Sequence, residues 1–233
     1  MKTKALLAAT TALLFTTMTY SQSQIWATRM NQSGYDDKLN AIAIDNSGNV
    51  YVTGYVTTQT SPEVHQDIVI IKYNSAGTQQ WKQVFDGFNG TDTNEYDAGN
   101  AIAISYESGT PYVYVTGTCY NNDNSSWPEP RHDMVLIKYR ASDGAFQWDR
   151  YEGMTGQLEQ YGGDAGYSIA IHDATDDIYI TGTRGQGSST SITDGALWKF
   201  DKNGNEHASS PITWNHANNL NDGGTDVVID AFT

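Results

Sequence analysis

The stretch DKLNAIAI at residues 37–44 decides the fold, because the chain repeats it. It recurs as DAGNAIAI at 97–104, as DAGYSIAI at 164–171 and, more weakly, as DGGTDVVI at 222–229. The leading aspartates are 60, 67 and 58 residues apart. A repeated period of this kind is typical of proteins that stack copies of one supersecondary unit.

Two further blocks follow each of the first three copies. The block VYVTG at 50–54 has its counterparts at 113–117 and 178–182, and DIVIIKY at 67–73 has its counterparts at 133–139 and 194–200. A glycine turn comes next, and a tryptophan soon follows it in the first two copies, with Trp214 a weaker candidate after the third.

These blocks have the composition of strands. Each is a short run of β-branched and aromatic residues bounded by Gly, Asn, Asp or Ser. Val50 and Val52 alternate with Tyr51 and Thr53, as on a strand with two different faces. The Ala-Ile-Ala-Ile block is apolar on both faces, so we expect it to be buried on both sides.

Four strands per repeat predict an all-β fold, a β-propeller built from four-stranded antiparallel blades. A β-solenoid is the competing architecture, but its repeats are usually shorter. The small alanines favour the Ala-Ile block as the innermost strand, near the propeller axis. The expected blades are residues 37–86, 97–151 and 164–216, with a partial blade at 222–233, within a repeat region of 22–233.

This strand order leaves one outer strand without a blade of its own. Trp26, within residues 24–30, stands where Trp81 and Trp148 stand in the repeats. Propellers commonly close their ring with a strand from one terminus. About three and a half blades do not close a ring, and an exposed strand edge promotes aggregation. We therefore expect the remainder of a longer chain to complete the ring, with self-association as the alternative.

The repeat resembles a known family. Trp26, then DKLNAIAID at 37–45, GNVYVTG at 48–54 and DIVIIKYNSAG at 67–77 are similar to the SBBP type of β-propeller repeat. The resemblance extends over about 24–230 and weakens through the third copy. It implies a propeller in a secreted or surface protein of bacteria, Bacteroidota in particular. It implies no single activity, because one fold carries many functions.

Residues 1–21 predict a secretory signal peptide. Lys2 and Lys4 precede an apolar run from Ala5 to Phe15, and small and polar residues end at Ser21. The run is too short to span a bilayer, and no later segment is long and apolar enough for a membrane helix. We expect an extracellular or outer-surface protein, with the periplasm as the alternative compartment. The single cysteine, Cys119, allows no internal disulfide.

The charge of the chain argues against nucleic acid as a partner. Without Lys2 and Lys4, 11 Lys and Arg stand against 27 Asp and Glu, a formal charge of −16. A protein with this charge repels nucleic acid and anionic lipid surfaces. An extracellular polysaccharide or protein is the partner class that remains.

Asp37, Asp97, Asp164 and Asp222 lead the four copies and suggest a ring of carboxylates at one mouth of the propeller. Carboxylate oxygens suit Ca²⁺, which is the candidate ion for this ring; we expect no other cofactor. Repetition in every blade favours the other interpretation, in which each aspartate accepts a hydrogen bond from a turn or from the neighbouring blade.

The loops after the Val-Tyr strands differ most between copies, and binding chemistry tends to lie on such loops. The second loop, residues 118–132, holds the candidate ligand-binding residues, which are Tyr120, Trp127, Glu129, Arg131 and His132. Its aromatic rings could stack on a sugar, and Arg131 could hold a carboxylate. The alternative is a solvated loop packed by its own Trp and Pro.

No catalytic constellation is evident in the sequence. The five histidines show no metal-ligand spacing, and neither a Gly-x-Ser-x-Gly elbow nor a phosphate loop occurs. We therefore expect a non-catalytic interaction module. A carbohydrate-active enzyme is the alternative, because chance pairs of carboxylates are numerous.

Overall fold

The structure is a computed structural model that describes residues 26–30, 35–59, 64–87, 96–121, 131–153, 163–185, 193–215 and 221–230. Its strands are β1 (Lys38–Ile44), β2 (Val50–Gln59), β3 (His65–Tyr73), β4 (Gln79–Phe85), β5 (Ala98–Glu107), β6 (Thr110–Asn121), β7 (Arg131–Arg140), β8 (Phe146–Glu152), β9 (Ala165–His172), β10 (Asp177–Gly185), β11 (Thr193–Phe200) and β12 (Ile212–Trp214). The described residues form no helix.

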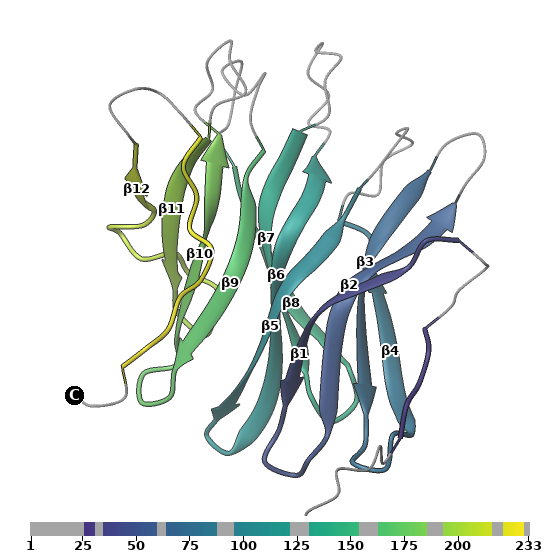
Figure 1. The fold of residues 1–233 in the computed structure, drawn as a ribbon. Helices are drawn as coiled ribbons and strands as arrows, with labels where there is room; N and C mark the ends of the chain where they lie inside the picture. The colour runs from purple at the N-terminus through teal and green to yellow at the C-terminus, as the bar shows by residue number, and fades with distance from the viewer. Residues whose placement is uncertain are drawn as a thin grey trace, which may run out of the picture.

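The strands form three antiparallel four-stranded sheets, each in chain order, which confirms the predicted all-β fold of propeller blades. We call β1–β4 blade 1, β5–β8 blade 2 and β9–β12 blade 3. The Ala-Ile strand lies at one edge of each sheet and the Trp-containing strand at the other. Figure 1 shows the sheets side by side, with β1, β5 and β9 next to one another.

Side-chain amides join the inner strands of neighbouring blades. Asn40 Nδ2 donates to the Gly99 carbonyl at 3.0 Å, and Asn100 Nδ2 donates to the Gly166 carbonyl at 3.0 Å. Each donor belongs to one blade and each acceptor to the next. This repeated contact places the Ala-Ile strands innermost, as the alanine content predicted.

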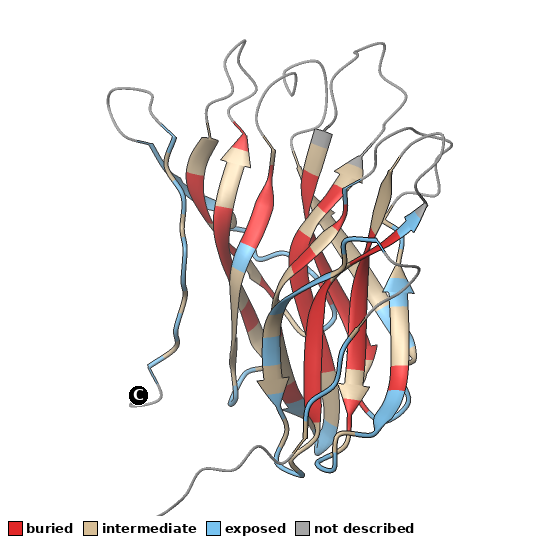
Figure 2. Cartoon of the chain, turned by 45° about the vertical axis from the view of Figure 1, so that its right-hand side comes forward, coloured by how far each residue is buried: buried red, intermediate tan, exposed pale blue. Residues whose placement is uncertain are grey.

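The apolar core lies between the blades, where Figure 2 shows the buried segments. One cluster joins Tyr51, Ile68 and Ile70 of blade 1 to Val115 and Ile137 of blade 2. A second cluster joins blade 2 to blade 3; it includes Tyr114, Leu136, Ile178, Ile180 and Trp198. Each blade therefore buries one face against each neighbour, which explains the alternation of the strands.

The outer-strand tryptophan of one blade binds the turn of the next. Trp81 Nε1 donates to the Ala141 carbonyl at 3.1 Å, and its ring lies against Gly144. Trp26 repeats this contact on blade 1, because its Nε1 donates to the Ser75 carbonyl at 3.2 Å. Residues 26–30 pair with no strand in the described part of the chain, but Trp26 occupies the place of an outer-strand tryptophan from a preceding blade.

The expectation that the Ala-Ile strand is buried on both faces is wrong for β1. Ile42 and Ile44 are 64% and 65% exposed, whereas the corresponding Ile102 of β5 is 9% exposed. Ile102 is buried because blade 1 covers it. Among the described residues no blade covers the equivalent face of blade 1, and the contact of Trp26 and Met30 is with the outer part of that face.

Residues 221–230 follow the inner-strand position of a fourth blade without forming a strand (Figure 1). Asp222 N donates to the Thr193 carbonyl at 2.8 Å, just as Asp97 N donates to Gln66 and Asp164 N to His132. This segment begins where the partial blade was expected.

Candidate binding hollow between blades 2 and 3

A hollow of about 500 Å³ opens between the inner parts of blades 2 and 3. Blade 2 contributes side chains from β5, β6 and β7, and blade 3 contributes side chains from β9, β10 and β11. The lining residues are Asn100, Thr118, His132, Gly163, Asp164, Ala165, Tyr167, Thr183 and Thr193. We call this space the hollow.

The repeats differ in side-chain size at two positions of this junction. Thr118 follows the conserved-looking glycine of its repeat, where the first repeat has Tyr55. Gly163 precedes Asp164, where Tyr96 precedes Asp97 in the copy before. At the junction of blades 2 and 3, a threonine and a glycine thus stand where the preceding copies have two tyrosines.

Two of the predicted binding residues meet at the edge of the hollow. The rings of Tyr120 and His132 lie 6.1 Å apart between centroids, at an interplanar angle of 79°. They face one another because the register pairs them across β6 and β7. Burial lowers the pKa of His132, so its imidazole is neutral at pH 7 and offers one donor and one acceptor.

The side chains of the other three predicted binding residues are not described by the structure. Trp127 and Glu129 lie outside the described residues. Arg131 is placed as the first residue of β7, and only its backbone is described. The predicted loop site is therefore placed only at Tyr120 and His132.

The predicted aspartates hold the start of each blade. The Asp37 carboxylate accepts from Thr57 N at 3.1 Å, and Asp97 accepts from Tyr120 N at 2.7 Å. Asp164 accepts from Gly185 N at 2.5 Å. Each bond joins the start of the inner strand to the end of the second strand of the same blade. In these three bonds the donor therefore lies on a strand of the same blade, not in a turn or in the neighbouring blade. Asp97 also accepts from Gly87 N, which follows β4 of the neighbouring blade. Asp222 contacts the Thr193 carbonyl through its backbone N–H, as described above.

One carboxylate group in the described part of the chain has metal-site dimensions. Potential ligand atoms of Asp67, Asp86 and Asp97 lie within 4.8 Å of one another. Burial raises the pKa of Asp97 to about 7 and also raises the pKa of Asp67, and the nearby carboxylates add to both shifts. An oxygen-ligated cation such as Ca²⁺ would fit this group of carboxylates. The Asp97 carboxylate would then bind the ion while it also accepts hydrogen bonds from backbone N–H groups. Asp67 and Asp86 were not predicted as ligands.

A pH dependence of stability follows from these buried carboxyls. Desolvation also raises the pKa of Glu152 to about 7, with Glu206 and Asp133 nearby. A carboxyl whose pKa is raised in the fold stabilises it fully below its unfolded pKa of about 4, and this contribution is lost as the pH rises through about 7. The neutral His132 opposes the trend, because its lowered pKa makes protonation below about pH 6.5 unfavourable.

We expect the melting temperature to rise as the pH falls from 8 to 5, and Glu152→Gln to reduce that rise. After allowance for solvent screening, the raised pKa of Glu152 changes the free energy of unfolding by about 1 kcal/mol between pH 8 and pH 5. This corresponds to roughly 2–4 °C in melting temperature. Scanning calorimetry of both proteins at pH 5, 6.5 and 8 measures the difference. An equal rise in the two proteins would show that Glu152 does not titrate in this window.

In the part of the chain that the structure describes, no helix has the length and apolar character needed to cross a membrane. A search of curated proteins found no match. Residues 25–55, which include Trp26, β1 and most of β2, match a family model described as SBBP, beta-propeller repeat. With three four-stranded antiparallel sheets, each in chain order, this match over residues 25–55 is consistent with an incomplete β-propeller.

Proposed function

We propose that this protein is a secreted or surface-bound, non-catalytic binding module that uses the hollow between blades 2 and 3. The hollow itself is the observation that carries the proposal, since it is a recess with hydrogen-bonding walls on well-packed strands. The signal-peptide pattern of residues 1–21 supports export, although those residues lie outside the described part.

The walls of the hollow are held by contacts that do not involve a ligand. Thr118 Oγ1 donates to the Asp164 carbonyl at 3.3 Å, and Asn100 Nδ2 donates across the blades to Gly166. The Asp164 carboxylate accepts from the Gly185 amide. A site fixed in this way loses little conformational entropy on binding, which favours recognition.

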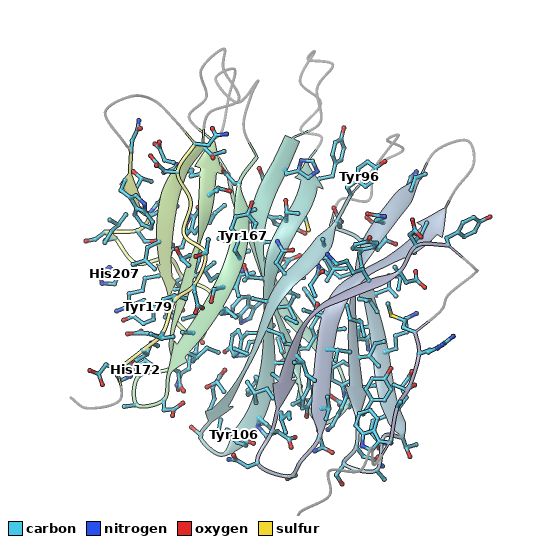
Figure 3. All side chains as sticks on the ribbon, in the orientation of Figure 1. Tyr96, Tyr106, Tyr167, His172, Tyr179 and His207 are labelled. Carbon is cyan, nitrogen blue, oxygen red and sulfur yellow. The ribbon has the colours of Figure 1, made fainter. Side chains whose placement is uncertain are left out.

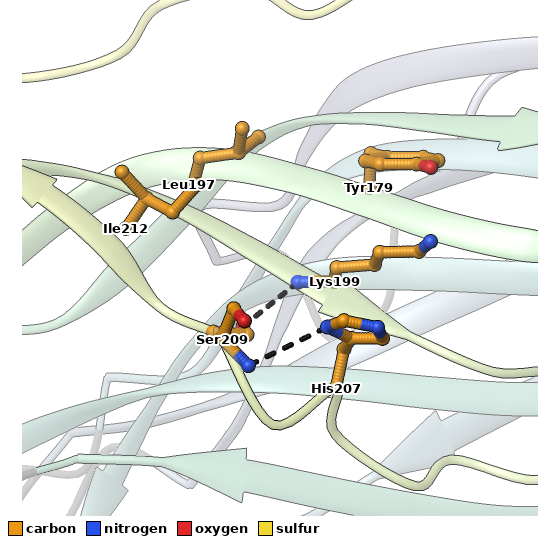
Figure 4. A pocket seen from close by; sticks show the side chains of 7 residues that line it. Tyr179, Leu197, Lys199, His207, Ser209 and Ile212 are labelled. Atoms are coloured by element: carbon orange, nitrogen blue, oxygen red, sulfur yellow. Dashed lines mark hydrogen bonds between the residues drawn. The ribbon is translucent and has the colours of Figure 1, made fainter.

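The face of blade 3 that is turned away from blade 2 is also hollowed. A second recess, of about 220 Å³, includes Tyr179, Leu197 and Lys199 in its lining (Figure 4). Lys199 pairs with Tyr179 in the register that joins Lys72 to Tyr51 and Lys138 to Tyr114.

We propose that a further blade packs on this face of blade 3. Lys72 Nζ donates to the Ala141 carbonyl at 2.9 Å, and Lys138 Nζ donates to the Lys202 carbonyl at 2.9 Å, so each lysine reaches the turn of the following blade. Lys199 occupies the equivalent register position, and its Nζ lies 2.9 Å from Asp177 Oδ2. A continuation of the chain would supply that blade, and a second copy of the chain is the alternative.

Residues 22–233 immobilised on a biosensor, with extracellular polysaccharides and proteins as analytes, test the binding function. We expect saturable binding that Thr118→Tyr weakens at least about tenfold, because the tyrosine restores the bulk of the first junction. Tyr55→Thr is the matched control and leaves binding unchanged. If Thr118→Tyr leaves the affinity unchanged, the assignment of the binding site to the hollow is wrong.

Turnover distinguishes the module from a carbohydrate-active enzyme. The reducing ends released from each polysaccharide that binds are measured over the same period. We expect none above the buffer control. Release that a single carboxylate substitution abolishes would overturn the non-catalytic assignment.

A further inference from the structure

The lining of the hollow selects against charged ligands. Asn100, His132, Tyr167 and the three threonines contribute amide, imidazole and hydroxyl groups. Among the described residues, no lysine or arginine belongs to the lining, and the chain carries a formal charge of −14, so this part of the lining gives an anion no counter-charge.

The one carboxylate in the lining gives a cation little to bind. Asp164 is a buried residue, and its Oδ1 accepts from the Gly185 amide at 2.5 Å. The neighbouring His132 is neutral at pH 7, because burial lowers its pKa. The three threonine hydroxyls and the Asn100 amide donate to backbone carbonyls, so each offers a ligand an acceptor oxygen. Uncharged acceptors of this kind, with the neutral imidazole of His132 beside them, fit the hydroxyl groups of a ligand.

An aromatic ring stands beside these groups. Tyr167, at the start of β9, is 44% exposed although it lines the hollow, and Figure 3 shows it on that strand between the blades. The Tyr120–His132 pair adds aromatic surface from the neighbouring blade. An exposed ring next to hydroxyl and amide groups suits a ligand with one apolar face and a polar edge, which describes a pyranose ring.

The ligand must also fit the available space. Small-molecule pockets typically measure roughly 300–1,000 Å³, so a hollow of about 500 Å³ suits a compact molecule. We propose that the hollow binds a neutral saccharide, with Tyr167 against the apolar face of the sugar and Thr118 and His132 at its hydroxyl groups. This inference rests on the proposed function, because it names the ligand of the same site.

Saturation-transfer NMR and calorimetric titration of residues 22–233 test the ligand class. The probes are glucose, galactose, mannose, cellobiose and lactose, with glucuronate and glucosamine as charged analogues. We expect at least one neutral probe to bind at least about fivefold more tightly than the charged analogues. We also expect Tyr167→Ala to weaken that binding about fivefold or more.

Two substitutions at one position separate filling of the hollow from loss of a hydroxyl. Thr118→Tyr should weaken binding at least about tenfold, while the nearly isosteric Thr118→Val should weaken it about threefold to tenfold. Tyr55→Thr, at the equivalent position of the first junction, should leave it within about twofold. Circular dichroism establishes that each variant is folded, and a variant that does not fold is replaced by Thr193→Val, which removes another hydroxyl group of the lining.

The outcomes distinguish this inference from the proposed function. If no neutral probe binds, or if glucuronate or glucosamine binds more tightly, the saccharide assignment is wrong. If a protein partner binds instead and Thr118→Tyr abolishes that binding, the binding function stands and the saccharide assignment falls. If a neutral saccharide binds and is cleaved, the saccharide assignment stands and the non-catalytic function falls.

Discussion

Gly117→Ala is expected to destabilise the protein by about 3 kcal/mol or more, equivalent to roughly 6–12 °C in melting temperature. A Cβ atom at this position would lie 1.9 Å from the Ala98 carbonyl oxygen and 3.0 Å from Gly99 Cα. Both neighbours are backbone atoms of β5, so no side chain can turn aside. The strands would have to separate where the β5–β6 register shifts between Gly99 and Ala101.

The same constraint applies in every blade. A Cβ at Gly54 would lie 1.8 Å from the Lys38 carbonyl oxygen, and one at Gly182 would lie 1.8 Å from that of Ala165. This close approach explains why the Val-Tyr block ends in glycine in all three repeats.

Gly109→Ala is the control, because it makes the same chemical change on the same hairpin. Gly109 has a φ of +84°, but a Cβ there would meet nothing within 4 Å. We expect it to cost about 1 kcal/mol, from the left-handed backbone alone. Thermal melts of the two variants measure the contrast, and equal melting temperatures would contradict the explanation from backbone contact.

Lys138→Met is expected to cost about 3–5 kcal/mol, because it breaks a buried ion pair at the junction of blades 2 and 3. Lys138 Nζ lies 2.6 Å from Glu107 Oε1, and the two side chains are 6% and 12% exposed. The ammonium also lies 4.2 Å from the centroid of the Tyr112 ring. Its removal leaves the Glu107 carboxylate largely buried, with the Tyr114 hydroxyl as a donor.

Lys72→Met is the matched control at the junction of blades 1 and 2. Lys72 donates to the Ala141 carbonyl, not to a carboxylate, so its replacement should cost about 1 kcal/mol. Adding Glu107→Gln to Lys138→Met should restore part of the stability, because it removes the unpaired charge. Denaturant unfolding measures all four proteins, and a double variant less stable than Lys138→Met would contradict the ion-pair explanation.

The repeat could be interpreted from sequence because its signals are local. Alternation in the Val-Tyr block and the turn residues between blocks depend on near neighbours, so the strands and their order were confirmed. The burial of β1 was predicted wrongly because it depends on another blade. The Ala-Ile block of β5 has a neighbour on that face, whereas that of β1 has none among the described residues.

The candidate site was predicted only in part. Tyr120 and His132 were found because they fall in the segment that differs most between the repeats, although the structure places them on β6 and β7 and not in a loop. Thr118 and Tyr167 were not recognised as lining residues of a shared hollow. Comparison of the repeats shows the difference at these positions, since Thr118 and Gly163 stand where the preceding copies have Tyr55 and Tyr96. Asp86 was missed because it meets Asp97 only after the blades pack together.

By itself, the sequence determined the repeat, four strands in each blade, the inner position of the Ala-Ile strand and the tryptophan that ends each unit. These features arise within one unit, where backbone geometry and side-chain alternation act over a few residues. Only the tertiary structure decided which residues meet between units. The hollow, the carboxylate group and the Lys138 contacts depend on how closely two packed sheets approach, and the volume of each side chain at the junction sets that distance.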